Sequence, residues 1–116
     1  MKYKVINKNK DFQAAYSKGS FAGSPICLAY FRRNGKKENR MGISTPKKVG
    51  NAVKRSRARR IIRAAYADIS DRLPKGYDII LCARPDTPKC KSTNIRNFLE
   101  FKLLPKMNGT AGKNGK

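Results

Sequence analysis

Cationic side chains dominate the segment from Gly50 to Tyr66, which reads GNAVKRSRARRIIRAAY. Six of the ten residues from 54 to 63 are lysine or arginine, and neither Asp nor Glu occurs between residues 39 and 67. Like charges held this closely repel one another, so an external polyanion is expected to neutralise them. The phosphate backbone of a nucleic acid is the partner that such a segment fits best.

The preference for arginine favours RNA over DNA. Residues 55–63 contain five arginines and no lysine, and a guanidinium group can grip two phosphate oxygens at once. Helices that read DNA grooves usually mix cations with Asn, Gln or Ser, which bind base edges. Only Ser56 is of that type here. Recognition of the backbone and shape of a folded RNA suits these side chains better.

Composition narrows the remaining classes of function. The 116 residues carry a net charge of +21, and 39% of them are hydrophobic, which predicts one folded domain with a modest core. No apolar run is long enough to span a membrane, and residues 1–12 lack the apolar core of a signal peptide, so we expect no membrane partner. Three cysteines without a CxxC pair, and no histidine, predict reduced thiols in the cytoplasm and no zinc site. The usual groups for acid–base catalysis are also missing, so any chemistry is expected to be supplied by another molecule.

Hydrophobic periodicity predicts the elements that position the cationic segment. Residues 1–10 are expected to trail over the surface, and an apolar face predicts a short helix over 11–18. Strands are predicted over 26–32 and 40–45, as an antiparallel pair, and over 77–83, where a continuous apolar run is typical of a central strand. A last helix is predicted from Ser92 or Thr93 to about residue 104.

The cationic segment itself is predicted to be an amphipathic helix that begins after Asn51, a suitable N-cap. Its apolar arc consists of Ala58, Ile61, Ile62, Ala65 and Ile69, with Arg59, Arg60 and Arg63 opposite and Arg55 and Tyr66 at the border. An ordinary solvated helix would carry mixed charges, whereas the i, i+4 pairs here are repulsive. A binding face is therefore favoured over a surface that serves solubility alone.

These elements predict an α+β fold, a single small sandwich with the order α-β-β-(β)-α-β-α. The optional strand lies near residues 20–22. The domain is expected to cover residues 1–104. Residues 105–116 form a Gly-, Asn- and Lys-rich basic tail that is expected to be disordered.

Residues 44–66, STPKKVGNAVKRSRARRIIRAAY, closely resemble the signature of the bacterial ribonuclease P protein family. That signature runs S-x-x-K-K-x-G-N-A-V, then R-N-R, then K-R-x-x-R, and a looser match extends from Asp11–Phe12 through the apolar strand at 77–83. The resemblance implies a left-handed βαβ crossover around the basic helix, contrary to the general rule for such connections. Two positions depart from the family pattern. Ser56 stands where the family usually has Asn, and Ala64 stands where the family often has an acidic or polar residue after the last Arg of the signature.

The resemblance also implies partners and roles. The protein would be the accessory subunit of an RNA-based endoribonuclease, whose catalytic RNA, with Mg²⁺ held chiefly by that RNA, removes the 5′ leader from precursor tRNA. No protein residue would be catalytic. The residues implied to meet the catalytic RNA are Lys47, Lys48, Asn51, Lys54, Arg55, Ser56, Arg57, Arg59, Arg60 and Arg63.

A second implied site would hold the single-stranded leader through Phe12, Tyr16, Tyr30 and Arg32. Exposed rings beside cations can stack on unpaired bases, although the same rings could simply belong to the core, and for Phe12 the two interpretations are equally good. The alternative function is a non-catalytic ribosomal or RNA-chaperone protein. A self-sufficient nuclease and a DNA-binding regulator fit the residues less well.

Overall fold

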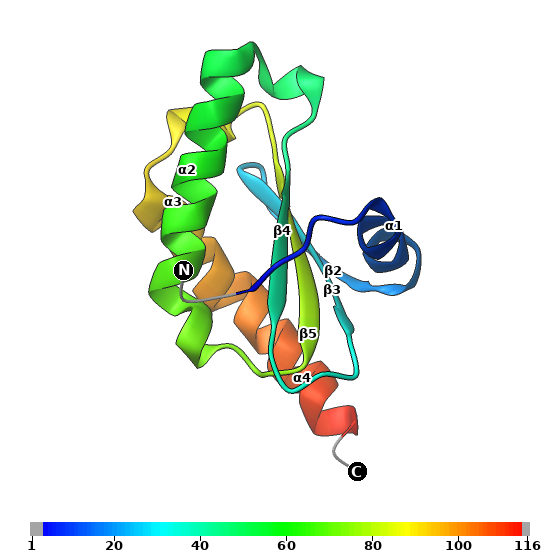
Figure 1. The fold of residues 1–116 in the computed structure, drawn as a ribbon. Coiled ribbons are helices and arrows are strands. Elements are labelled where there is room, and N and C mark those ends of the chain that lie inside the picture. The colour runs from blue at the N-terminus through cyan, green and yellow to red at the C-terminus, as the bar shows by residue number, and fades with distance from the viewer. Residues whose placement is uncertain (1–3, 115–116) are drawn as a thin grey trace.

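A five-stranded sheet with helices on both faces forms the body of the computed structural model, which describes residues 4–114 (Figure 1). The strands are β1 (Lys4–Val5), β2 (Ser20–Gly23), β3 (Cys27–Arg33), β4 (Arg40–Ser44) and β5 (Tyr77–Ala83), in the spatial order β1-β4-β5-β3-β2. The helices are α1 (Asn9–Lys18), α2 (Ala52–Ile69), α3 (Ser92–Phe98), a π-helical segment (Leu99–Leu103) and α4 (Leu104–Asn114). The mixed α+β fold, including the optional strand near residue 20, is as predicted.

Strand β5 occupies the centre of the sheet, as its continuous apolar sequence predicted. All seven of its residues are buried, and it pairs antiparallel with β3 and parallel with β4. The predicted antiparallel pairing of the strands at 26–32 and 40–45 is therefore wrong. A strand that is apolar on both faces needs cover from both faces and a neighbour on each side, so β5 lies between the two strands that precede it.

The connection β4–α2–β5 is a left-handed crossover. In Figure 1 both strands run upward, β4 lies nearer the viewer than β5, and α2 descends on the left. Connections of this kind are right-handed in nearly all proteins, and only the family resemblance predicted the exception.

Two hydrophobic clusters fill the two faces of the sheet. The larger lies under α2, α3 and the C-terminal helical segments, and the smaller, which includes Ile80 and Cys82, lies under α1. The predicted buried arc of α2 is confirmed for Ala58, Ile62, Ala65 and Ile69. Tyr66, predicted at the border of the cationic face, is instead fully buried, because its large ring adds to the core beside Ile62 and Ile69.

Both ends of the described chain are more ordered than the sequence suggested. Lys4 and Val5 pair with β4 rather than trailing over the surface. The predicted disordered tail is helical through residue 114, and Met107 is completely buried in the larger cluster. The apolar spacing of Leu103, Leu104 and Met107 continues the preceding helical face, which the Gly- and Lys-rich composition obscured. The remainder of both predicted segments, residues 1–3 and 115–116, lies outside the described residues.

Candidate nucleic-acid interface

Four aromatic rings form a row on the face of the sheet that α1 covers. The centroids of Phe12 and Tyr16 are 6.5 Å apart, those of Tyr16 and Tyr30 are 5.0 Å apart, and those of Tyr30 and Phe21 are 5.1 Å apart. Phe12 and Tyr16 come from one face of α1, while Phe21 and Tyr30 are directly paired across β2 and β3. The three rings proposed from the sequence for a leader site therefore do lie together.

Phe21 is the member of this row that sequence reasoning missed. Phe21 is 44% exposed, whereas Phe12, Tyr16 and Tyr30 are half-buried. A usable signal was present, since a strand at residues 20–22 paired with β3 would place Phe21 beside Tyr30. An exposed ring next to half-buried ones offers a face on which an unpaired base can stack.

The close approach of α1 to the sheet depends on Gly42 in β4. A Cβ atom added there would meet Cζ of Phe12 at 2.7 Å and Cδ1 of Ile80 at 3.2 Å. The absent side chain therefore leaves room for the Phe12 ring over β4. Phe12 both packs against the sheet and begins the aromatic row, so neither of its two interpretations excludes the other.

The strand register places Arg32 beside the aromatic row. Residues 28, 30 and 32 share the α1 face of β3, and Arg32 is paired directly with Asp78 of β5. Asp78 is in turn paired with Arg40 of β4. A charged row thus runs across three strands, one side-chain repeat away from the row that contains Tyr30.

On the same face, Cys82 of β5 is paired with Ser44 at the end of β4, just before the basic segment 45–51 that leads into α2. The Tyr16 hydroxyl lies 3.8 Å from Sγ of Cys82, and burial raises the pKa of both groups, partly offset by the nearby Ser44 hydroxyl. The charge of Lys48 is close enough to act against the rise in the pKa of Cys82. Lys48 therefore lies within electrostatic reach of Cys82, which contacts Tyr16 of the aromatic row.

The cationic segment presents its side chains to solvent from a capped helix. Oδ1 of Asn51 accepts a hydrogen bond from the backbone N–H of Lys54 at 3.0 Å, so Asn51 is the N-cap of α2 as predicted. Of the ten residues proposed to meet RNA, Arg55 is half-buried and the rest are exposed. Those nine are Lys47, Lys48, Asn51, Lys54, Ser56, Arg57, Arg59, Arg60 and Arg63.

Two arginines on α2 are oriented by protein acceptors that the sequence did not indicate. Nη2 of Arg59 donates to the Thr45 hydroxyl at 2.7 Å, and Nε of Arg57 donates to the carbonyl oxygen of Pro88 at 2.9 Å. In each case the rest of the guanidinium group keeps donors for a ligand. Because these side chains are already ordered in the free protein, binding a ligand costs less conformational entropy.

Ion pairing leaves the cationic segment without neutralisation. Six of the seven acidic residues lie in ion pairs, and their cationic partners are Lys4, Arg40, Arg72, Lys89 and Arg96. Within residues 4–114, none of these pairs includes any of the eight cations between residues 47 and 63. The protein's own carboxylates stabilise other parts of the fold, and the surface at 47–63 keeps its full charge.

Metal-ligating side chains do not gather in the described part of the chain. No group of three or more His, Cys, Asp or Glu residues there is arranged to hold an ion. Across residues 4–114, none of the helices combines the length and the hydrophobicity that a membrane span requires.

Comparisons with known proteins agree on one family. The family model named Ribonuclease P matches residues 1–107. The ribonuclease P protein component of Alkaliphilus oremlandii is 34% identical over 103 residues, covering 89% of this chain and 90% of the relative. A structure of the Staphylococcus aureus RNase P protein is similar with a TM-score of 0.76 and 35% identity, covering 88% of this chain and 94% of that one. The Thermotoga maritima RNase P protein shares the fold, with a TM-score of 0.73 at 24% identity over 90% and 94% of the two chains. This chain therefore belongs to the ribonuclease P protein family.

Proposed function

We propose that this chain is the protein subunit of a bacterial ribonuclease P, in which it assists a catalytic RNA in removing the 5′ leader from precursor tRNA. Its relatives carry the name of this component. Within the complex, which would work in the cytoplasm, the chain has two tasks. It binds the catalytic RNA through the cationic segment, and it holds the single-stranded leader on the α1 face of the sheet.

The observation that carries this proposal is the un-neutralised cationic segment. Together with Lys47 and Lys48, which precede it, the segment carries eight cations between residues 47 and 63. Most of them are exposed, and the ion pairs of the described chain leave all eight without an acidic partner. Lys54 and Arg55 also stand in the first turn of α2, where the helix dipole disfavours positive charge. A phosphate group at that position would interact favourably with both the helix terminus and the cations.

Leader binding is supported by the row of Phe12, Tyr16, Tyr30 and Phe21. Stacking on aromatic side chains contributes about 1–3 kcal/mol per base and tolerates any base, because every base has a π face. Such a site suits leaders of varied sequence. Arg32, on the same face, would meet a phosphate of the bound strand.

Hydrolysis of the phosphodiester bond is assigned to the RNA and its Mg²⁺. The chemistry the metal supplies is activation of water and stabilisation of charge on the leaving oxygen. The chain's own contribution is to bind and position substrate, and to lower the Mg²⁺ concentration at which the complex works by screening phosphate repulsion with its cations.

Reconstitution tests this function. The full chain is combined with a bacterial ribonuclease P RNA at low Mg²⁺, and cleavage of precursor tRNA is compared with that by the RNA alone. We expect strong stimulation by the protein and no cleavage by the protein without RNA. Absence of stimulation would reject the proposal and leave the ribosomal or RNA-chaperone alternative. Cleavage without any RNA would instead indicate a self-sufficient nuclease.

A further inference from the structure

The last ring of the aromatic row stands on the edge strand of the sheet. Strand β2 has four residues, and it lies at the end of the strand order, where β3 is its only strand partner among residues 4–114. Phe21 is one of its exposed residues. A short strand with one partner opens more readily than a central strand, so the position of the Phe21 ring depends on what holds the outer edge of β2.

The Phe21 ring rests on its own strand. Phe21 and Tyr30 are register partners, and their ring centroids are 5.1 Å apart. A Cβ atom added at Gly23 would meet Cζ of Phe21 at 2.7 Å and Cε2 at 3.0 Å, so the ring lies over the bare backbone of Gly23. A shift of β2 relative to β3 would therefore carry the ring away from Tyr30.

The C-terminal helical segments pack against β2 from the other face of the sheet. Successive side chains on a strand point to opposite faces, so Ala22 faces away from the aromatic row. It is buried in the larger hydrophobic cluster, which also contains Leu103 and Met107. The π-helical segment contacts β2 directly, and the small side chain of Ala22 leaves room for this approach.

Lys106 of α4 contacts β2 at the residue that carries the last ring. Its Nζ atom donates a hydrogen bond to the backbone carbonyl oxygen of Phe21 at 2.7 Å. The next residue, Met107, is completely buried, so the backbone from which Lys106 extends is fixed by the core. The ammonium group therefore ties the edge strand to the C-terminal helix.

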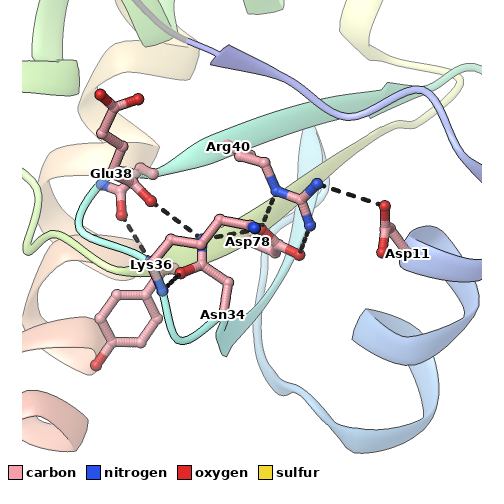
Figure 2. Close-up of polar contacts among 8 residues, drawn as sticks. Asp11, Asn34, Lys36, Glu38, Arg40 and Asp78 are labelled. Atoms are coloured by element: carbon pink, nitrogen blue, oxygen red, sulfur yellow. Dashed lines mark hydrogen bonds and ion pairs between the residues drawn. The ribbon is translucent and has the colours of Figure 1, made fainter.

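The opposite end of the aromatic row is held by another cationic side chain. Figure 2 shows the Arg40 guanidinium between Asp78 of β5, at 2.6 Å, and Asp11 of α1, at 3.5 Å. Asp11 directly precedes Phe12, so this ion pair ties the first ring of the row to the sheet. Each end of the row is thus anchored by a cation from a different element.

We propose that Lys106 is a positioning residue for leader binding, which holds β2 and Phe21 where the ring extends the aromatic row. This inference rests on the proposed function. It gives α4 a part in substrate affinity, although neither the family signature nor the aromatic row includes any residue of that helix. Lys106 acts through the Phe21 backbone, so its contribution is expected only for substrates that carry a leader.

The test compares three single variants. Lys106→Met removes the donor and the charge but keeps a side chain of similar length, and Lys106→Arg keeps both. Lys102→Met is the matched control, because Lys102 is exposed on the preceding π-helical segment and takes part in none of the ion pairs formed by residues 4–114. Each protein is reconstituted with the catalytic RNA, and KM and kcat for leader-bearing precursor are measured beside the affinity for mature tRNA. Thermal unfolding verifies that each variant is folded.

We expect Lys106→Met to raise KM for leader-bearing precursor about two- to tenfold, as for the loss of one hydrogen bond. Its kcat and its affinity for mature tRNA should stay nearly unchanged, as expected when only binding is lost. Lys106→Arg and Lys102→Met should resemble the wild type. The backbone amides of residues 20–23 should exchange hydrogen faster in Lys106→Met than in the wild type, because β2 has lost its outer contact.

A double-variant cycle tests whether the effect passes through Phe21. Phe21→Ala removes the ring that Lys106 is proposed to position, so adding Lys106→Met to it should raise KM no further. An undiminished effect of Lys106→Met in Phe21→Ala would overturn the proposal, as would equal effects of Lys106→Met and Lys102→Met or an equal loss of affinity for mature tRNA. Failure of the wild-type protein to stimulate cleavage would instead reject the proposed function.

Discussion

At the scale of single residues, Tyr30 is the centre of the proposed leader site. Its ring contacts Tyr16 on one side and Phe21 on the other, and it is neither fully buried nor fully exposed. The family resemblance implied its role, and a hydroxyl-bearing ring suits a partly wet site. Phe21 was missed because its exposure depends on how the edge strand β2 pairs, which is a non-local property.

Replacing Tyr30 separates stacking from packing. Tyr30→Ala is expected to weaken binding of leader-bearing precursor to the reconstituted complex by about 1–3 kcal/mol, the value of one stacked base, and to leave binding of mature tRNA nearly unchanged. Tyr30→Phe keeps the ring and should bind precursor almost as well as the wild type. Affinities for both substrates, measured by titration for each variant, give the answer. An equal loss of affinity for precursor and mature tRNA would reject the stacking role.

At the scale of elements, local periodicity predicted more than strand order did. The apolar arc of α2 and the central position of β5 follow from residue type alone, because burial on one face or on two leaves a direct imprint on the sequence. The identity of the strand that each strand pairs with leaves no such imprint on the local sequence. Strands β3 and β4 are consecutive in the chain, yet β5 lies between them in the sheet. Long-range packing determines this order. The handedness of the crossover likewise has no local signal.

Helix α2 offers a case in which stability and binding can be changed separately at one residue. Asn51→Ala removes the side-chain acceptor for the Lys54 N–H and is expected to lower the free energy of unfolding by about 1 kcal/mol. Asn51→Asp keeps a capping oxygen and places a negative charge at the positive end of the helix, so stability should be retained or raised.

Affinity for the catalytic RNA should follow the opposite order. The aspartate variant adds a negative charge among the cations and is expected to bind more weakly than the alanine variant. Urea unfolding and RNA titration on the same three proteins provide both measurements. If Asn51→Asp were destabilised as much as Asn51→Ala, the capping role assigned to Asn51 would be wrong.

At the scale of the whole molecule, the few carboxylates join elements that the chain order keeps apart. Asp78 of β5 binds Arg40 of β4 and Asn34 of the β3–β4 loop (residues 34–39), and Arg40 also reaches Asp11 of α1. Burial alone would raise the pKa of Asp78, but the hydrogen bonds from Arg40 and Asn34 and the nearby positive charges prevail and hold it below its ordinary value. With a net charge of +21, the fold depends on the few acids that offset its self-repulsion.

The lowered pKa of Asp78 predicts how stability varies with pH. Because the folded protein favours the ionised carboxylate, Asp78 contributes its full stabilisation above the ordinary aspartate pKa of about 3.9, and the contribution is lost as the pH falls below that value through the lower pKa of the folded state. Asp78→Asn should therefore be less stable than the wild type at neutral pH by about 2 kcal/mol. That value lies below the 3–5 kcal/mol typical of fully buried pairs, since Arg40 keeps 24% of its side chain exposed.

The difference between the two proteins should shrink as the pH is lowered from about 4, and urea unfolding at a series of pH values measures it. Asp86→Asn is the matched control, because Asp86 forms an exposed pair with Lys89 at 3.7 Å, and its loss should cost less than about 1 kcal/mol at any pH. A difference for Asp78→Asn that stayed constant down to the lowest pH would mean that the asparagine disturbs packing. In that case the charge of Asp78 would not be what ties α1, β4 and the β3–β4 loop to the centre of the sheet.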